Sequence, residues 1–223
     1  MLRAMIDPLA CPRCKKPLDL CVCDAIPTLS AKTHVLFLQH PQEPDVDLGS
    51  ALIAHLSLPH STLRIGLSWP NLKAALGRDD AVAGRWAALH LGSGPKGEVK
   101  VADSERLLFV DKHGAQAADQ HPPLDGIVVL DGTWSQAKTL WWRNAWLLKL
   151  RRAIVRPAKP SLYRELRSEP RRECLSTIET VAETLDALGE PKETGEGLRA
   201  LFGELLRRYR GRNRRGADYR PGG

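Results

Sequence analysis

Residues 130–140, LDGTWSQAKTL, place acidic, hydroxyl and aromatic side chains where an apolar run ends. Asp131 and Gly132 follow the run GIVVL, and Thr133 and Gln136 fit the T-x-x-Q pattern of a helix capping box. In open α/β sheets, ligands bind at the carboxyl ends of strands, where helix N-termini expose backbone donors. The stretch is therefore a candidate ligand site, although Asp-Gly is also a common turn pair and Thr133 would cap a helix without any ligand.

A second candidate is the stretch LQHPQE at residues 38–43, which also follows an apolar run. It places His40 and Glu43 beside Pro41, a residue that ends strands. A single histidine in such a position is more often structural than catalytic, so His40 is the weaker candidate.

A third stretch, PSLYRELRSEPRRECLSTIET at residues 160–180, joins a basic loop to a second capping box. Ser176 and Glu179 fit the S-x-x-E form of that box. Arginines near a helix N-terminus can bind a carboxylate or phosphate, but a solvated basic loop would have the same composition. The candidate side chains in this loop are Tyr163, Arg164 and Arg167.

Four of the five cysteines lie within thirteen residues as C-x2-C-x6-C-x-C, at Cys11, Cys14, Cys21 and Cys23. In a reducing compartment such spacing favours thiolates that share a soft metal, and four sulfurs complete a tetrahedral zinc shell. The Cys-Val-Cys spacing is tighter than usual, so a redox or empty site remains an alternative. We predict that residues 1–28 form a small zinc-binding appendage in which the metal replaces a hydrophobic core.

The rest of the chain has the pattern of an α/β protein. Apolar runs without polar alternation suit strands that are buried on both faces, and several are separated by segments with helical spacing. We therefore predict a largely parallel sheet flanked by helices. The clearest predicted strands are 33–38, 86–92, 106–110, 126–130 and 152–156, and the predicted helices are 134–149, 176–188 and about 195–209.

The first of these predicted helices has an apolar face formed by Trp134, Ala137, Trp141, Ala145 and Leu148. On this pattern Trp134 is the first core residue of the helix. A ligand contact for its ring is the alternative.

The net charge of +7 is concentrated in residues 207–223, which hold seven arginines and one aspartate. Such a basic tail suits the phosphate backbone of RNA or DNA, although a solvated, disordered terminus would have the same composition. No stretch reaches the roughly 20 apolar residues needed to span a bilayer, and the N-terminal apolar run is too short for a signal peptide. We expect a cytoplasmic protein that does not enter membranes.

The combination of VLDGTWSQAKTLWWRN, SLYRELRSEP and CLSTIETVAETL, preceded by LFLQHPQE and the cysteine cluster, resembles the DTW-domain family of tRNA-uridine aminocarboxypropyltransferases. The likeness runs from about Cys11 to about Leu188. It implies a SPOUT-like α/β catalytic domain over residues 29–206 and suggests a knotted C-terminal half. It also implies S-adenosylmethionine as donor and transfer of its 3-amino-3-carboxypropyl group to N3 of a tRNA uridine, which releases methylthioadenosine.

The resemblance also implies which residues form the site. The catalytic group is expected to be Asp131, Thr133 and Trp134, and the donor-binding group Gln39, His40, Leu130, Gln136, Tyr163, Arg164, Arg167, Ser176, Thr177 and Glu179.

The expected chemistry assigns roles to some of these residues. Uridine N3 is a poor nucleophile until its proton is lost, so Asp131 is expected to accept that proton. The donor carboxylate would bind Arg164 or Arg167, or the backbone amides at the Ser176 helix start. The ring of Trp134 would stack on adenine or on the target uridine.

The chain departs from the family pattern at Glu179-Thr180, where Glu-Ala is common, and at DLGSA, residues 47–51, which leaves any ligand role of that loop open. Two other functions remain as alternatives. One is a SPOUT-type RNA methyltransferase with the same donor, and the other is a non-catalytic RNA-binding module built from the zinc site and the basic tail.

Overall fold

The structure is a computed structural model that describes residues 9–44, 46–89, 106–157, 161–162 and 175–218. Tyr163, Arg164 and Arg167 lie outside the described residues. The elements in chain order are η1 (Leu18–Leu20), β1 (His34–Gln39), α1 (Ala51–Ser57), β2 (Ser61–Ile65), α2 (Leu72–Leu76), η2 (Ala83–Arg85), β3 (Trp86–Leu89), β4 (Leu107–Val110), β5 (Gly126–Asp131), α3 (Trp134–Arg143), η3 (Ala145–Lys149), β6 (Arg151–Val155), α4 (Thr177–Ala187) and α5 (Lys192–Asp218).

The strands form one six-stranded sheet in the order β2-β1-β5-β3-β6-β4. All neighbouring pairs are parallel except β4 with β6, which is antiparallel. Strands β1, β3, β4 and β5 are buried along their whole length, as their apolar runs predict. The predicted fold class, a largely parallel sheet flanked by helices, is confirmed. Strand β2 was not predicted, because its sequence STLRI is mostly polar and lies partly exposed at the edge of the sheet.

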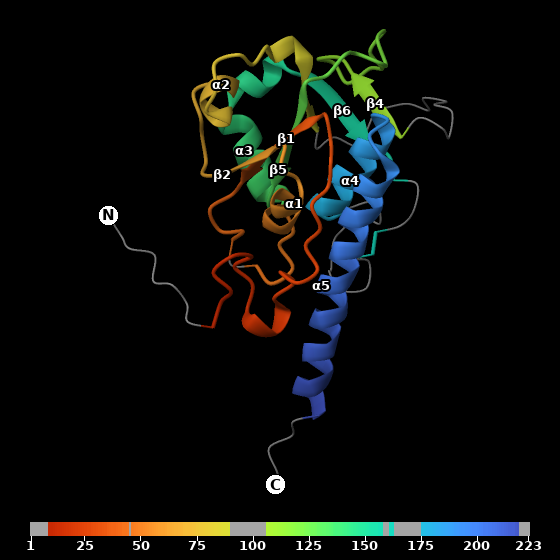
Figure 1. The fold of residues 1–223 in the computed structure, drawn as a ribbon. Helices are drawn as coiled ribbons and strands as arrows, with labels where there is room; N and C mark the ends of the chain where they lie inside the picture. Colours follow the sequence, from red (N-terminus) through yellow and green to blue (C-terminus); the bar gives the residue numbers. More distant parts are fainter. Residues whose placement is uncertain (1–8, 45, 90–105, 158–160, 163–174, 219–223) are drawn as a thin grey trace.

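Helices cover both faces of the sheet (Figure 1). On one face, Val35 and Phe37 of β1 belong to a core shared with α1, α4 and α5. On the other face, Leu36 and Leu38 belong to a second core shared with α2, α3 and η3. Because side chains alternate along a strand, this division also decides which face each residue at a strand end occupies.

The predicted helix 134–149 is two elements. Helix α3 ends at Arg143, and η3 follows after Asn144. The fully buried side chain of Asn144 donates to the carbonyls of Leu140 and Leu67 and accepts from the backbone N–H of Trp69. The side-chain amide of Asn144 thus binds a carbonyl of the last turn of α3 and the backbone of a distant loop, and the helix ends there.

The predicted apolar face of this segment is also wrong at both ends. Trp134 and Leu148 are exposed, whereas Leu140 and Leu147 are fully buried. The break at Asn144 rotates the following residues, so a single helical stripe does not continue through it. Trp134 is therefore not a core residue.

Helix α5 begins at Lys192 and continues to Asp218, so it is longer than the predicted 195–209. It runs from the body of the protein down beside the N-terminal segment (Figure 1). Leu20 and Val22 of that segment are fully buried in the same core as Leu205 of α5. Part of the predicted appendage therefore packs on the main core, and its boundary near residue 28 stays a prediction.

No helix of the described residues is both long and apolar enough to cross a membrane. The threading of a knotted C-terminal half stays a prediction.

Candidate functional site

The candidate site lies at the carboxyl ends of β1 and β5. The two strands pair in parallel and end side by side, with Gln39 opposite Asp131. Helix α1, which follows β1, packs on one face of the sheet, and α3, which follows β5, packs on the other. Neighbouring strands whose chains leave toward opposite faces form the topological switch point at which α/β proteins bind ligands.

Asp131, the last residue of β5, is only 3% exposed. Its Oδ2 accepts a hydrogen bond of 2.7 Å from Nε2 of Gln39, and its Oδ1 accepts one from the hydroxyl of Thr177. The backbone N–H of His40 donates to the carbonyl of Asp131 at 2.9 Å. The structure thus brings four predicted site residues together, and neutral donors from β1 and α4 orient the carboxylate.

The turn after Asp131 is tight. A Cβ at position 132 would lie 2.8 Å from the Cβ of Gln136, so the close approach requires Gly132. The predicted capping box is present: Thr133 accepts from the backbone N–H of Gln136, and Gln136 Oε1 accepts from the N–H of Thr133 at 2.6 Å. Thr133 and Trp134 are both exposed. The start of α3 is therefore exposed to solvent next to Asp131.

The second capping box, at the start of α4, is buried. Glu179 is 5% exposed, and its Oε2 accepts from the N–H and the hydroxyl of Ser176 and from the hydroxyl of Ser161. Its Oε1 accepts from the backbone N–H of Leu162 at 2.7 Å. Glu179 therefore fixes the chain after β6 to the start of α4, and donor binding by this residue stays a prediction.

The loop between β1 and α1 joins the same start. The hydroxyl of Ser50, at the N-cap position of α1, accepts from the backbone N–H of Ile178 at 3.1 Å. The amides of Ser176, Ile178 and Glu179 are thus bonded to side chains of the protein. In this structure these three amides are not directed at a ligand.

A buried lysine that sequence reasoning missed lies among the clustered cysteines and contacts the loop after β1. Lys16 is 3% exposed, and its Nζ donates to the carbonyl of Val46 at 2.7 Å. Burial lowers the pKa of Lys16 to about 8, although the negative charges of Cys14 and Asp131 oppose this change. Lys16 therefore holds the loop after β1 and supplies positive charge beside Asp131.

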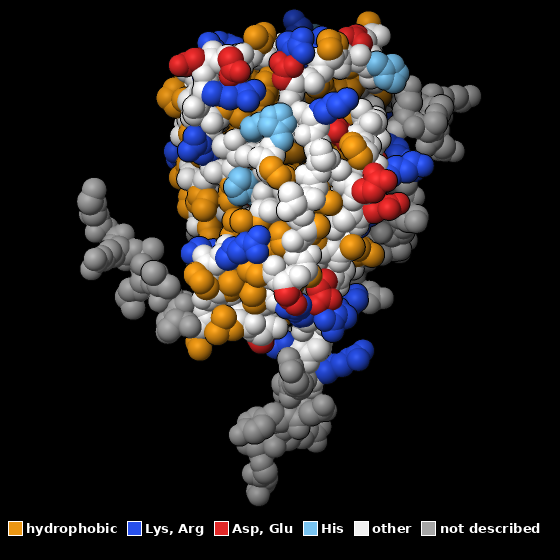
Figure 2. All heavy atoms as spheres, in the orientation of Figure 1, with side chains coloured by type: hydrophobic (Ala, Val, Ile, Leu, Met, Phe, Trp, Pro, Cys, Tyr) orange, Lys and Arg blue, Asp and Glu red, His pale blue; other side chains and the backbone are white. Residues whose placement is uncertain are grey.

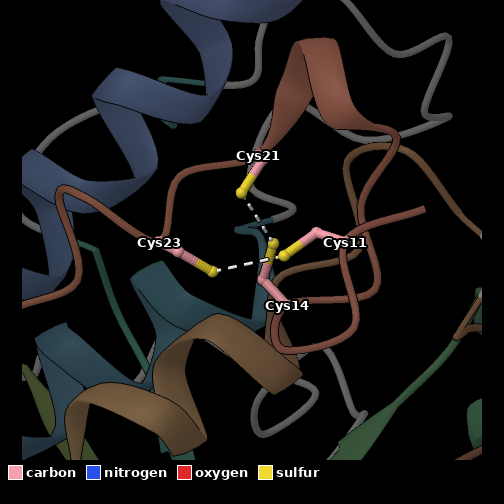
Figure 3. A group of neighbouring side chains, drawn as sticks. All are labelled: Cys11, Cys14, Cys21 and Cys23. Atoms are coloured by element: carbon pink, nitrogen blue, oxygen red, sulfur yellow. Dashed lines mark hydrogen bonds between the residues drawn. The ribbon is translucent and has the colours of Figure 1, made fainter. Parts of the chain in front are cut away.

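The four clustered cysteines form a candidate metal centre. Figure 3 shows that Cys11 and Cys14 come from one loop, and Cys21 and Cys23 from the segment after η1, with all four side chains converging. The sulfurs all lie within 4.8 Å of one another, and the Cys11–Cys23 and Cys14–Cys21 pairs are 3.6 and 3.7 Å apart. Four sulfurs at about 2.3 Å from a tetrahedral zinc would be about 3.8 Å apart. The cluster therefore fits a metal of this size and geometry.

The thiols of this cluster differ in acidity. The backbone N–H of Cys14 lowers the pKa of Cys11 to about 6, whereas burial raises the pKa values of Cys21 and Cys23. A bound cation would favour the thiolate form of all four, because its charge compensates for their mutual repulsion.

The basic C-terminal part of α5 is partly neutralised within the protein. Arg208 pairs with Asp24 at 2.7 Å, and Arg212 pairs with Asp47. Arg207 pairs with Glu204 at 2.6 Å. Figure 2 shows the resulting neighbourhood of basic and acidic side chains at the lower end of the molecule, where α5 emerges. Two arginines of the predicted RNA-binding tail thus hold the N-terminal segment and the loop between β1 and α1.

The chain is similar in sequence to proteins of one known family. The family model of the DTW domain matches residues 9–210. The chain belongs to the DTW-domain family. It is 28% identical over 196 residues to tRNA-uridine aminocarboxypropyltransferase 2 of Drosophila melanogaster, covering 84% of this chain and 70% of the relative.

Mammalian proteins of the same name are also similar. The identity is 26% over 180 residues for Macaca fascicularis and 28% over 189 residues for Mus musculus, in each case over 80% of this chain. This chain spans only 56% of the length of each of these two mammalian relatives. No solved structure matches it significantly.

The DTW domain does not bring every predicted site residue to one place. Leu130 is 8% exposed and packs in the core with α3, on the face of the sheet opposite to the one that Asp131 faces. Tyr163, Arg164 and Arg167 lie outside the described residues.

Proposed function

We propose that this DTW-domain protein transfers the 3-amino-3-carboxypropyl group of S-adenosylmethionine to N3 of a tRNA uridine and releases methylthioadenosine. The observation that carries the proposal is the oriented carboxylate of Asp131 at the switch point between β1 and β5. The names of the similar proteins support the same reaction.

The reaction needs an acceptor for one proton and a fixed direction of attack. As N3 forms a bond to the methylene carbon next to the sulfonium, the carbon–sulfur bond breaks and its electrons remain on sulfur. The N3 proton passes to the carboxylate of Asp131, which Gln39 and Thr177 hold in place. The sulfonium is already a good leaving group, so most of the remaining catalysis is orientation.

Anchoring the amino acid end of the donor selects the methylene carbon over the methyl group. The amides of Ser176, Ile178 and Glu179 are already bonded, which favours Arg164 or Arg167 for the donor carboxylate. Of the remaining predicted donor-binding side chains, Gln39, His40, Gln136 and Thr177 lie near the ends of β1 and β5 or at the start of α4, and Tyr163 lies outside the described residues.

The decisive experiment incubates the purified chain with unmodified tRNA and S-adenosylmethionine, followed by nucleoside mass spectrometry. We expect a uridine with an added aminocarboxypropyl group. With Asp131→Asn we expect transfer to fall by at least about 100-fold, because the amide is a far weaker proton acceptor.

Donor binding by calorimetry and the circular dichroism spectrum serve as controls for the variant. Addition of a methyl group would assign a methyltransferase, and no transfer under conditions where the donor binds would refute the proposal. Full activity of a folded Asp131→Asn protein would remove Asp131 as the proton acceptor.

We also propose that the cysteine cluster binds structural zinc. The four sulfurs lie within 4.8 Å of one another, which is close enough to share one zinc ion, and the same segment carries the fully buried Leu20 and Val22. The metal would therefore stabilise a segment that packs on the main core. Metal analysis of the purified chain should find about one zinc per chain, and Cys21→Ser should lose it. Iron in place of zinc, or a folded chain without metal, would contradict this proposal. A cytoplasmic location stays a prediction.

A further inference from the structure

The outer face of α3 carries two tryptophans with a lysine between them. Trp134, Lys138 and Trp142 follow one another at intervals of four residues, so they form one stripe along the helix. The opposite face of α3 is buried through Ala137 and Leu140. The stripe covers about 12 Å of helix and begins three residues after Asp131.

The two rings of this stripe are unusually accessible. Trp142 is 77% exposed, the highest value for a large hydrophobic side chain among the described residues, and Trp134 is 44% exposed. Neighbouring Trp141 is more buried, and the guanidinium of Arg152 lies 5.7 Å from the centre of its ring. Packing within the protein therefore accounts for a tryptophan at position 141 but not for one at position 142.

The charge of the stripe limits what it can bind. The ammonium of Lys138 lies 5.2 Å from the centre of the Trp134 ring, and Lys138 is exposed. Exposed aromatic rings interleaved with basic groups are typical of surfaces that bind single-stranded nucleic acid, since bases stack on the rings and phosphates contact the cations. A base-paired duplex does not offer its base faces to such a surface.

We propose that the stripe of Trp134, Lys138 and Trp142 binds unpaired nucleotides of the RNA substrate beside the target uridine. This inference rests on the proposed function, which makes RNA the substrate. An RNA strand whose target uridine lies at the end of β5 passes the N-terminus of α3, which begins three residues after Asp131, and continues along the outer face of that helix. Trp142 and Lys138 are then RNA-binding residues outside the reaction centre.

The test measures the affinity of the full chain for a short, labelled single-stranded RNA and for a duplex RNA of the same length. Trp142→Ala should weaken single-strand binding at least about fivefold, the lower end of the effect of losing one stacked base. Trp142→Phe should restore most of the affinity, and duplex binding should change less than about twofold in both variants.

Lysine variants separate the role of Lys138 from general charge. Lys138→Gln should lower the slope of log affinity against log salt for the single strand by about 0.7, the loss of one phosphate contact. Lys192→Gln is the matched control, because Lys192 is exposed at the start of α5, near the opposite end of the sheet, where Glu190 contacts Thr33 before β1. It should leave the slope unchanged.

Several results would overturn the inference. One is an unchanged affinity of Trp142→Ala for the single strand, and another is an equal loss of affinity for the duplex. A third is a Trp142→Ala protein that binds RNA normally but no longer binds anionic vesicles, which would assign the stripe to a membrane surface. Failure of the proposed function is distinguishable, because it would appear as absent transfer by the wild-type chain. In that case a selective loss of single-strand binding by Trp142→Ala would still support the stripe.

Discussion

Two helices begin beside Asp131 with the same capping pattern, yet their surroundings differ. At the start of α3, Gln136 caps an exposed turn and reaches the side chain of Gln42 at 3.2 Å. At the start of α4, the buried carboxylate of Glu179 accepts four hydrogen bonds, from Ser161, Leu162 and Ser176. The start of α3 is exposed to solvent, whereas the start of α4 is buried and links separate segments of the chain.

The difference follows from the chemistry of the two capping residues. A glutamine amide has a single acceptor oxygen, whereas a carboxylate has two and no donor, so it can collect several donors from separate segments. Glu179 joins the chain after β6 to α4, and Thr177 then joins α4 to Asp131. The start of α4 fixes the position of the candidate catalytic carboxylate, while the start of α3 is exposed to solvent.

The largest loss of stability is expected when the hydrogen bonds of Glu179 at the start of α4 are removed. Glu179→Ala would remove the acceptor of the N–H and the hydroxyl of Ser176 and of the N–H of Leu162. Each unsatisfied buried group costs about 1–3 kcal/mol, so we expect the free energy of unfolding to fall by about 4 kcal/mol. Urea denaturation monitored by tryptophan fluorescence measures this change.

Gln136→Ala is the matched control at the exposed start. Gln136 has the same place in its capping box as Glu179 has in the other. Solvent replaces the hydrogen bonds that the variant loses, so the free energy of unfolding should fall by only about 0.5–1 kcal/mol. Equal losses for the two variants would show that burial of Glu179 does not distinguish the two helix starts.

Much of this comparison could be predicted from local sequence patterns. Both capping boxes follow from residues three positions apart, and the buried strands follow from apolar runs such as GIVVL. These signals are local, so they do not depend on the order of strands in the sheet. Which of the two starts is buried does depend on it, and the sequence therefore could not distinguish them.

Other features depend on contacts between segments that are distant in the sequence, so local patterns could not predict them. The break after α3 depends on the hydrogen bonds of Asn144 to Leu67 and Trp69, and nothing in residues 134–149 alone indicates them. The burial of Lys16 depends on the cysteine loop packing beside the loop after β1. The motif identified Asp131, but the pairing of its carboxylate with Gln39 required the register of β1 and β5.

A smaller effect on stability, with a larger effect on activity, is expected at Thr177. Thr177→Val keeps the shape of the side chain but removes the hydroxyl that donates to Oδ1 of Asp131. Hydrogen bonds to charged groups contribute about 1.5–3 kcal/mol, so the free energy of unfolding should fall by about 2 kcal/mol, less than for Glu179→Ala. Because the carboxylate also loses its orientation, kcat for transfer should fall about tenfold or more. A higher KM for the donor would in addition indicate the donor contact predicted for Thr177.

Thr180→Val is the control within the same helix. Its hydroxyl donates only to the carbonyl of Ser176, so this variant should lose less than about 1 kcal/mol of stability and keep its kcat. A Thr177→Val protein with unchanged kcat would mean that the link from α4 serves stability alone. The buried start would then be a structural joint without influence on Asp131, and the difference between the two helix starts would concern folding rather than catalysis.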